Sequence, residues 1–165
     1  MKESAGKGII SGMGNNLLAN TPLIAAVISC VIAQLLKPVF AVLAGHKFSY
    51  HQLLTTGGMP SSHTSAVIAL TSSIGAIYGI ENVAFAISFV FSIIVMHDAM
   101  GIRLEAGKQA KVINEWSEIL SKMHKDGPFE PTNLKTLLGH SFAQVLAGAI
   151  LGLVIGLSSA AFAVR

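Results

Sequence analysis

Four apolar runs, each close to the length of a bilayer crossing, constrain what this chain can fold into. They cover residues 21–43, 60–79, 83–100 and 139–163, and polar segments separate them. In the hydrocarbon core of a bilayer only helices and closed barrels satisfy their own backbone, and a helix needs about 20 apolar residues to cross it. Since 52% of the residues are hydrophobic and 12% are charged, the sequence predicts an all-α integral membrane protein built as a four-transmembrane-helix bundle.

The polar segments divide the chain without adding a second domain. Residues 1–19 are Gly-rich and mildly charged, which predicts an N-terminal tail, and residues 20–165 are predicted to form a single membrane domain. Residues 101–138 form a long polar loop between the third and fourth spans. Within this loop, apolar residues recur at a helical period, which predicts an amphipathic helix: Ile102, Ala106, Ala110, Ile113, Trp116 and Leu120.

The basic residues predict how the bundle is oriented. With four spans, the segments at 45–59 and 101–138 lie on one side of the membrane and both termini lie on the other. Lysine and arginine favour cytoplasmic loops, so the loop side is predicted to face the cytoplasm at the inner (plasma) membrane of a bacterium. The net charge of +3 suits anionic lipid headgroups, and no nucleic-acid partner is expected. The loop side carries Lys47, Arg103, Lys108, Lys111, Lys122, Lys125 and Lys135, against Lys2, Lys7 and Arg165 on the other side.

The break before the second span carries groups suited to binding an anion. Gly57, Gly58 and Pro60 interrupt the chain, and Ser61 or Ser62 can cap the helix that follows. Free amides at a helix N-terminus bind anions such as phosphate. The alternative is a capped helix start with an interfacial histidine at position 63 and no further role.

The predicted topology brings four more ionisable residues to the same side, namely Lys37, Asp98, Arg103 and His140. A lysine within a span marks a functional site by default, although one near a helix end can also reach the headgroups. Lys37 and Arg103 are therefore candidates to hold phosphate oxygens. The alternative for Arg103 is that it only contacts the phosphate of a membrane lipid. Asp98 is expected to have a supporting role, in which it orients Arg103 or ties the third span to the loop.

A histidine and an amide share one helix face at the start of the fourth span. His140 and Gln144 are four residues apart, so the amide can hold the imidazole in one tautomer and leave its other nitrogen to attack phosphorus. If His140 is the nucleophile, His63 would protonate the leaving oxygen. The alternative is that His140 is an interfacial histidine with no catalytic role. The spacing of the remaining histidines matches no usual set of metal ligands, so no metal is expected at His46, His51, His97 or His124.

Over residues 20–160 these features resemble the type 2 phosphatidic acid phosphatase and vanadium haloperoxidase superfamily, in its small divergent membrane branch. Pro60-Ser61-Ser62-His63 corresponds to the superfamily motif Pro-Ser-Gly-His. His140-x3-Gln144-Val145-x2-Gly148 corresponds to the end of the motif that carries the nucleophile, and Lys37 is the candidate for the first motif. The stretch from Met96 to Ala110 is what most resembles the divergent branch.

The resemblance implies a metal-independent lipid phosphate phosphatase that needs no cofactor. By position, His140 would form a phosphohistidine and His63 would protonate the leaving alcohol. The phosphate would be bound by Lys37, Arg103, Ser61 and Ser62. The expected substrates are phospholipid phosphomonoesters such as phosphatidylglycerophosphate or phosphatidate.

Three departures from the superfamily pattern keep a second function open. Ala44 and Leu134 stand where the superfamily has arginines, and Gln144 replaces the carboxylate that orients the nucleophile. The alternative is therefore a weak or inactive relative that binds anionic lipid or packs against other helices. A homodimer is a further expectation, because small residues allow close helix contact along Gly148, Gly152 and Gly156.

Overall fold

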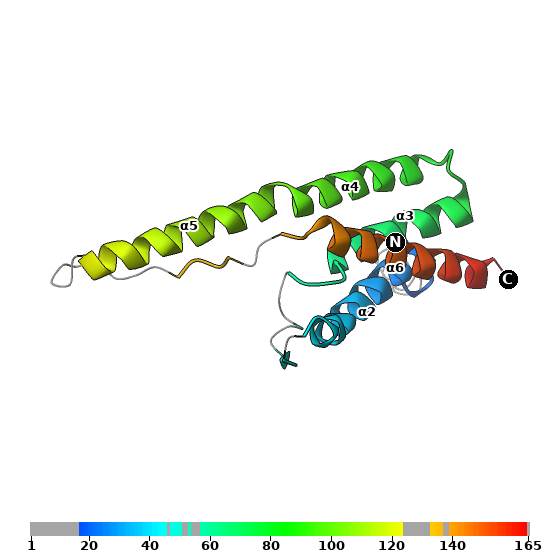
Figure 1. Cartoon of the computed structure of the whole chain (residues 1–165). Coiled ribbons are helices and arrows are strands. Elements are labelled where there is room, and N and C mark those ends of the chain that lie inside the picture. Colours follow the sequence, from blue (N-terminus) through cyan, green and yellow to red (C-terminus); the bar gives the residue numbers. More distant parts are fainter. Residues whose placement is uncertain are drawn as a thin grey trace, which may run out of the picture.

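The computed structural model describes residues 17–45, 47–50, 53, 57–123, 133–136 and 139–164. These residues form helices and connecting segments and contain no strand. The prediction of an all-helical chain is therefore confirmed for the described residues. The helices are α2 (Thr21–Leu43), α3 (Ser62–Tyr78), α4 (Val83–Met100), α5 (Ile102–Met123) and α6 (Phe142–Ala163) (Figure 1).

Polar side chains cap the start of each apolar helix. The oxygen of Asn20 accepts the amide of Leu23 at 3.1 Å, and that of Asn82 accepts the amide of Ala84 at 2.8 Å. Such caps satisfy amides that have no partner inside the helix, which fixes where the helix begins. Ser61 and Ser141 cap α3 and α6 in the same way.

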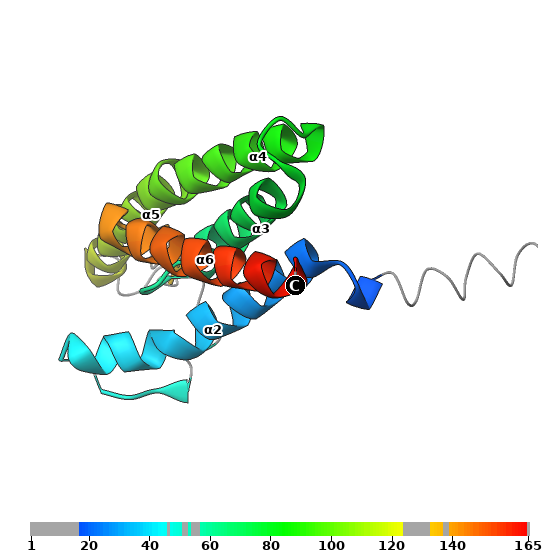
Figure 2. The same ribbon diagram turned by 90° about the vertical axis from the view of Figure 1, so that its right-hand side faces the viewer.

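The core of the bundle is α3, which packs against α2, α4 and α6. Figure 2 shows α3 between α4 and α6, and among the helix pairs that touch, α4 and α6 make the smallest contact. Hydroxyl pairs join α3 to its neighbours. Ser29 and Ser65 lie 2.5 Å apart, and Thr71 and Ser92 lie 2.9 Å apart, so these buried polar groups satisfy one another in an otherwise apolar interior.

The three spaced glycines of α6 lie against α3 within the same chain. All three are buried. A side-chain carbon on Gly148 or Gly152 would collide with the carbonyl oxygen of Ser61 or Ser65, and one on Gly156 would collide with the hydroxyl of Ser72. The face predicted for a homodimer is therefore already occupied by α3. A homodimer stays a prediction, and it would need a different surface.

Among the described residues, three helical stretches are long and apolar enough to cross a membrane: α2, α6, and α4 taken together with α5. Many large apolar side chains of α2, α4 and α6 are exposed, as expected of surfaces that face lipid. The bundle is thus that of a membrane protein. At 17 residues, α3 is shorter than a usual crossing, so the count of four spans stays a prediction.

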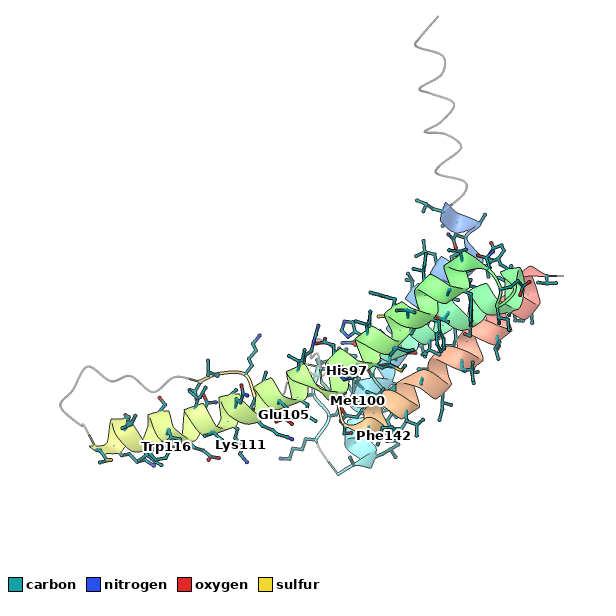
Figure 3. The ribbon with its side chains drawn as sticks, turned by 90° about the horizontal axis from the view of Figure 1, so that it is seen from above. His97, Met100, Glu105, Lys111, Trp116 and Phe142 are labelled. Atoms are coloured by element: carbon teal, nitrogen blue, oxygen red, sulfur yellow. The ribbon has the colours of Figure 1, made fainter. Side chains whose placement is uncertain are left out.

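Helix α5 occupies the first part of the predicted polar loop, but it continues α4 after a break at Gly101. Figures 1 and 3 show α5 extending from the end of α4 beyond the rest of the bundle, with Glu105, Lys111 and Trp116 along its length. Its place as a separate amphipathic helix inside a loop stays a prediction. The division between a tail at 1–19 and one domain at 20–165 also stays a prediction, since residues 1–16 lie outside the described part of the chain.

Candidate active site

A cavity of about 240 Å³ lies where the start of α3, the end of α4, the start of α5 and the segment before α6 meet. The structure therefore places four of the predicted site residues around one space, although they come from four different segments. The cavity is lined by His63, Ile94, Val95, Asp98, Ala99, Arg103, Gly139 and His140.

A backbone hydrogen bond fixes the position of His140 directly before the N-terminus of α6. Its amide donates to the carbonyl of Ala99 at 2.9 Å, which ties the histidine to the last turn of α4. The residue is 4% exposed. Because Ser141 is the N-cap of α6, His140 lies just outside the helix and its ring reaches the cavity rather than the helix surface.

The side chain of Gln144 fixes which ring nitrogen of His140 carries the proton. Oε1 of Gln144 accepts the amide of Ser141 at 3.1 Å as part of a capping box, which identifies this atom as the amide oxygen. Nδ1 of His140 lies 3.2 Å from the same oxygen. Since an amide oxygen only accepts, Nδ1 must donate, and Nε2 then carries the lone pair.

The surroundings of His140 favour its neutral form. The histidine lies two residues before α6 begins. Burial lowers its pKa below the ordinary value of 6.5, and the positive charges of Lys37, His63 and Arg103 lower it further, while the hydrogen bond to Gln144 acts in the opposite direction. A neutral imidazole with its lone pair on Nε2 is the form that can act as a nucleophile.

Gly139 allows the segment before α6 to approach the start of α5 very closely. Its φ is +81°, a conformation that favours glycine, and a side-chain carbon here would collide with the backbone of Leu104 and come within 2.9 Å of Arg103. This contact brings Arg103 to the cavity that His140 lines. Gly139 is not among the residues predicted from the sequence, although a glycine directly before the candidate nucleophile was a usable signal.

The start of α3 is tied to the start of α6. The amide of Ser61 donates to the carbonyl of Gln144 at 3.0 Å, and its hydroxyl accepts from the hydroxyl of Thr64 at 3.0 Å. Ser61 and Ser62 are buried and do not line the cavity, whereas His63 is exposed and lines it. The serines therefore position the first turn of α3, and His63 faces the space.

Lys37 is buried and does not line the cavity. The residue is 3% exposed, and its aliphatic stem runs beside Gly58, 3.8 Å from where a side-chain carbon of that glycine would be. Its positive charge adds to the effect of burial in lowering the pKa of His140. Lys37 thus lies within electrostatic reach of the site without lining it.

Arg103 and Asp98 form an ion pair across the break between α4 and α5. Nε of Arg103 lies 2.6 Å from Oδ2 of Asp98, and their side chains are 57% and 36% exposed. The carboxylate therefore orients the guanidinium at the rim of the cavity. Since Nε alone makes this contact, the terminal nitrogens are the part of Arg103 suited to an anion.

One wall of the cavity is apolar, and the sequence analysis missed it. Ile94, Val95 and Ala99 of α4 line the space together with the charged groups. The available signal was helical spacing, because Ile94 precedes Asp98 by one turn and so lies on the same face. His97 does not line the cavity. The other histidines considered for metal, His46, His51 and His124, lie outside the described residues.

Comparison with known proteins decides the family. A model described as the divergent PAP2 family matches residues 18–155. The chain belongs to the divergent PAP2 family. The chain is also similar to the uncharacterized membrane protein YuiD of Bacillus subtilis (strain 168), with 35% identity over 155 residues that cover 88% of this chain and 98% of YuiD. This similarity supports a membrane protein.

No solved structure matches the chain significantly. Membership of the divergent PAP2 family confirms the resemblance drawn from Pro60–His63 and His140–Gly148. The roles of individual residues in this divergent PAP2 protein remain predictions, and the geometry of the cavity makes each of them testable.

Proposed function

We propose that this protein is a lipid phosphate phosphatase that hydrolyses phosphomonoesters such as phosphatidylglycerophosphate or phosphatidate through a phosphohistidine. The observation that supports this most strongly is the arrangement around His140. Its Nδ1 is held by Gln144, and it shares a cavity with a second histidine and an arginine. A nucleophile, an acid and a cation are the groups that phosphoryl transfer needs.

In the first step, Nε2 of His140 attacks phosphorus and the bond from phosphorus to the lipid alcohol breaks. Protonated His63 gives its proton to the departing oxygen, so the alcohol leaves neutral. The products are the free lipid alcohol and a phosphohistidine at position 140. His63 suits this role because it comes from α3 and lines the same cavity as His140.

In the second step, a water molecule attacks the phosphorus of the phosphohistidine. His63, now neutral, takes a proton from that water, and the bond between phosphorus and Nε2 breaks. Inorganic phosphate leaves, and both histidines return to their starting forms. His63 thus acts as the acid in the first step and as the base in the second, because the proton that it gives to the alcohol is replaced by one taken from water.

Charged and backbone donors would stabilise the phosphoryl oxygens in both steps. Arg103 would bind them with its terminal nitrogens while Asp98 keeps hold of Nε. The buried charge of Lys37 and the first amides of α3 would add to this stabilisation. Since side chains supply the positive charge, the proposed reaction requires no metal.

The proposed location is the inner membrane of a bacterium with the cavity facing the cytoplasm. The excess of lysine and arginine on the loop side supports this orientation. Substrates would then be lipid phosphates present in the cytoplasmic leaflet.

A weaker activity is the second candidate, and Gln144 is the observation that favours it. A neutral amide fixes the tautomer of His140 but gives little support to the positive charge that develops on the ring during attack. Such a chain would bind lipid phosphates at the cavity and turn them over slowly or not at all.

Phosphate release from phosphatidate and phosphatidylglycerophosphate in mixed micelles, with a metal chelator present, tests the proposal. Release by the wild type, inhibition by vanadate and loss in a His140→Ala variant are expected. A His97→Ala variant is the matched control, because His97 is a neighbouring histidine that does not line the cavity. Absence of release from a panel of lipid phosphates, in the wild type and in a Gln144→Glu variant, would contradict the proposal.

A further inference from the structure

The cavity is lined by two chemically different groups of side chains. His63, Arg103 and His140 are polar or charged, while Ile94, Val95 and Ala99 of α4 are apolar. A soluble phosphate ester would leave the apolar side chains facing water or a polar group, which is unfavourable. A ligand that suits both groups has a phosphate and an apolar chain next to it.

The apolar wall continues out of the cavity along α4. Ile94 is 59% exposed although it lines the cavity, so its side chain belongs to both the wall and the outer surface of the helix. Phe91 and Ile87 follow at one and two turns from Ile94 on the same face, and both are exposed. Together with Ile94 they form an apolar track that starts at Asp98 and runs away from the cavity.

The packing of the bundle leaves this track uncovered. Both α4 and α6 pack on α3, and their contact with each other is small. Close to the cavity the two are joined through the hydrogen bond from His140 to Ala99. The path from the cavity along α4 is therefore open on the side that faces lipid.

We propose that Ile94 and Val95 bind the first part of the hydrocarbon chain of the substrate, and that this contact selects phosphates carrying a long chain over soluble phosphate esters. The proposal rests on the proposed function for the identity of the reacting group. It assigns to α4 a role in specificity that is separate from the charged residues. The occupant of the track is the chain of the bound phosphate compound itself.

Binding of phosphonates tests this without turnover, because the carbon–phosphorus bond is not hydrolysed. Dodecylphosphonate and methylphosphonate are titrated by calorimetry into the protein in phosphatidylcholine nanodiscs, with empty nanodiscs subtracted. The variants are Ile94→Thr, which keeps the branch at Cβ but replaces apolar surface with a hydroxyl, and Ile93→Thr, the same change at an exposed position of α4 outside the cavity.

The wild type is expected to bind dodecylphosphonate more tightly than methylphosphonate. Ile94→Thr is expected to weaken the binding of dodecylphosphonate about fivefold and to leave methylphosphonate unchanged, whereas Ile93→Thr changes neither. An unchanged chain preference in Ile94→Thr, or an equal loss for both compounds, would overturn the inference. Phosphate release measured on the same preparations separates the two proposals. Release with no effect of Ile94 on chain preference rejects this inference alone, whereas Ile94-dependent binding without release rejects only the hydrolysis.

Discussion

Nδ1 of His140 and Oε1 of Gln144 lie 3.2 Å apart, and the same oxygen accepts the backbone amide of Ser141. The amide oxygen therefore orients the histidine and caps α6 with a single atom. What it lacks is charge. A carboxylate in its place could make both hydrogen bonds and also stabilise a positively charged ring.

A Gln144→Glu variant is expected to hydrolyse lipid phosphates faster than the wild type, by about tenfold or more in kcat, because the carboxylate supports the charge that forms on His140. Gln144→Leu, which removes both hydrogen bonds, is the control and should lose activity. Initial rates of phosphate release measure both. A Glu variant no faster than the wild type would contradict the role assigned to this position.

The pH dependence of kcat/KM should reflect the lowered pKa of His140. Attack requires the neutral ring, so activity falls as the pH drops through the pKa of this histidine, and that fall is expected below 6.5. A carboxylate at position 144 raises the pKa, so the acid limb of Gln144→Glu should move to higher pH. Profiles of the two proteins across the acid range test this, and an acid limb that does not respond to position 144 would argue against it.

Arg103→Ala is expected to reduce kcat/KM by about a hundredfold to a thousandfold, because it removes donors to the transferred phosphoryl group. The same change should alter the free energy of unfolding by less than about 1 kcal/mol, since the ion pair with Asp98 is exposed to solvent. Activity and thermal unfolding are measured on one preparation. Equal catalytic loss in Lys108→Ala, an exposed cation that does not line the cavity, would show a general effect of charge instead.

Gly152→Leu is expected to destabilise the bundle by about 3 kcal/mol or more, because the new side chain would meet the backbone of α3 at Ser65. Ala161→Leu makes a similar small-to-large change at an exposed position of α6 and should be tolerated. Thermal unfolding in detergent compares them. If both variants unfolded at the wild-type temperature, α6 would not pack on α3 through its glycines.

Helix positions could be predicted from the sequence because apolar length and capping residues are local signals. The runs at 21–43 and 83–100 coincide with α2 and α4. At α6 the predicted start was three residues early, because Gly139 adopts a positive φ and Ser141 acts as the N-cap, which keeps this short segment outside the helix. That small difference places His140 in the cavity.

Contacts between helices could not be predicted in the same way. The spacing of Gly148, Gly152 and Gly156 indicates a close contact, but one helix alone does not reveal whether α3 or another chain fills it. Likewise, the polar residues indicated a site on one side of the bundle, whereas the apolar wall at Ile94 depends on how α4 lies beside α3. The approach of Arg103 depends on Gly139, more than thirty residues later in the chain.

The central claim is that His140 carries the phosphoryl group during hydrolysis. The most direct measurement is to mix the protein with radiolabelled lipid phosphate, quench in alkali, and locate the label by peptide mapping. We expect a label that is stable to alkali and labile to acid, attached to His140, absent from His140→Ala and retained in His97→Ala. Release of inorganic phosphate by the wild type without labelled His140 at any quench time would contradict it.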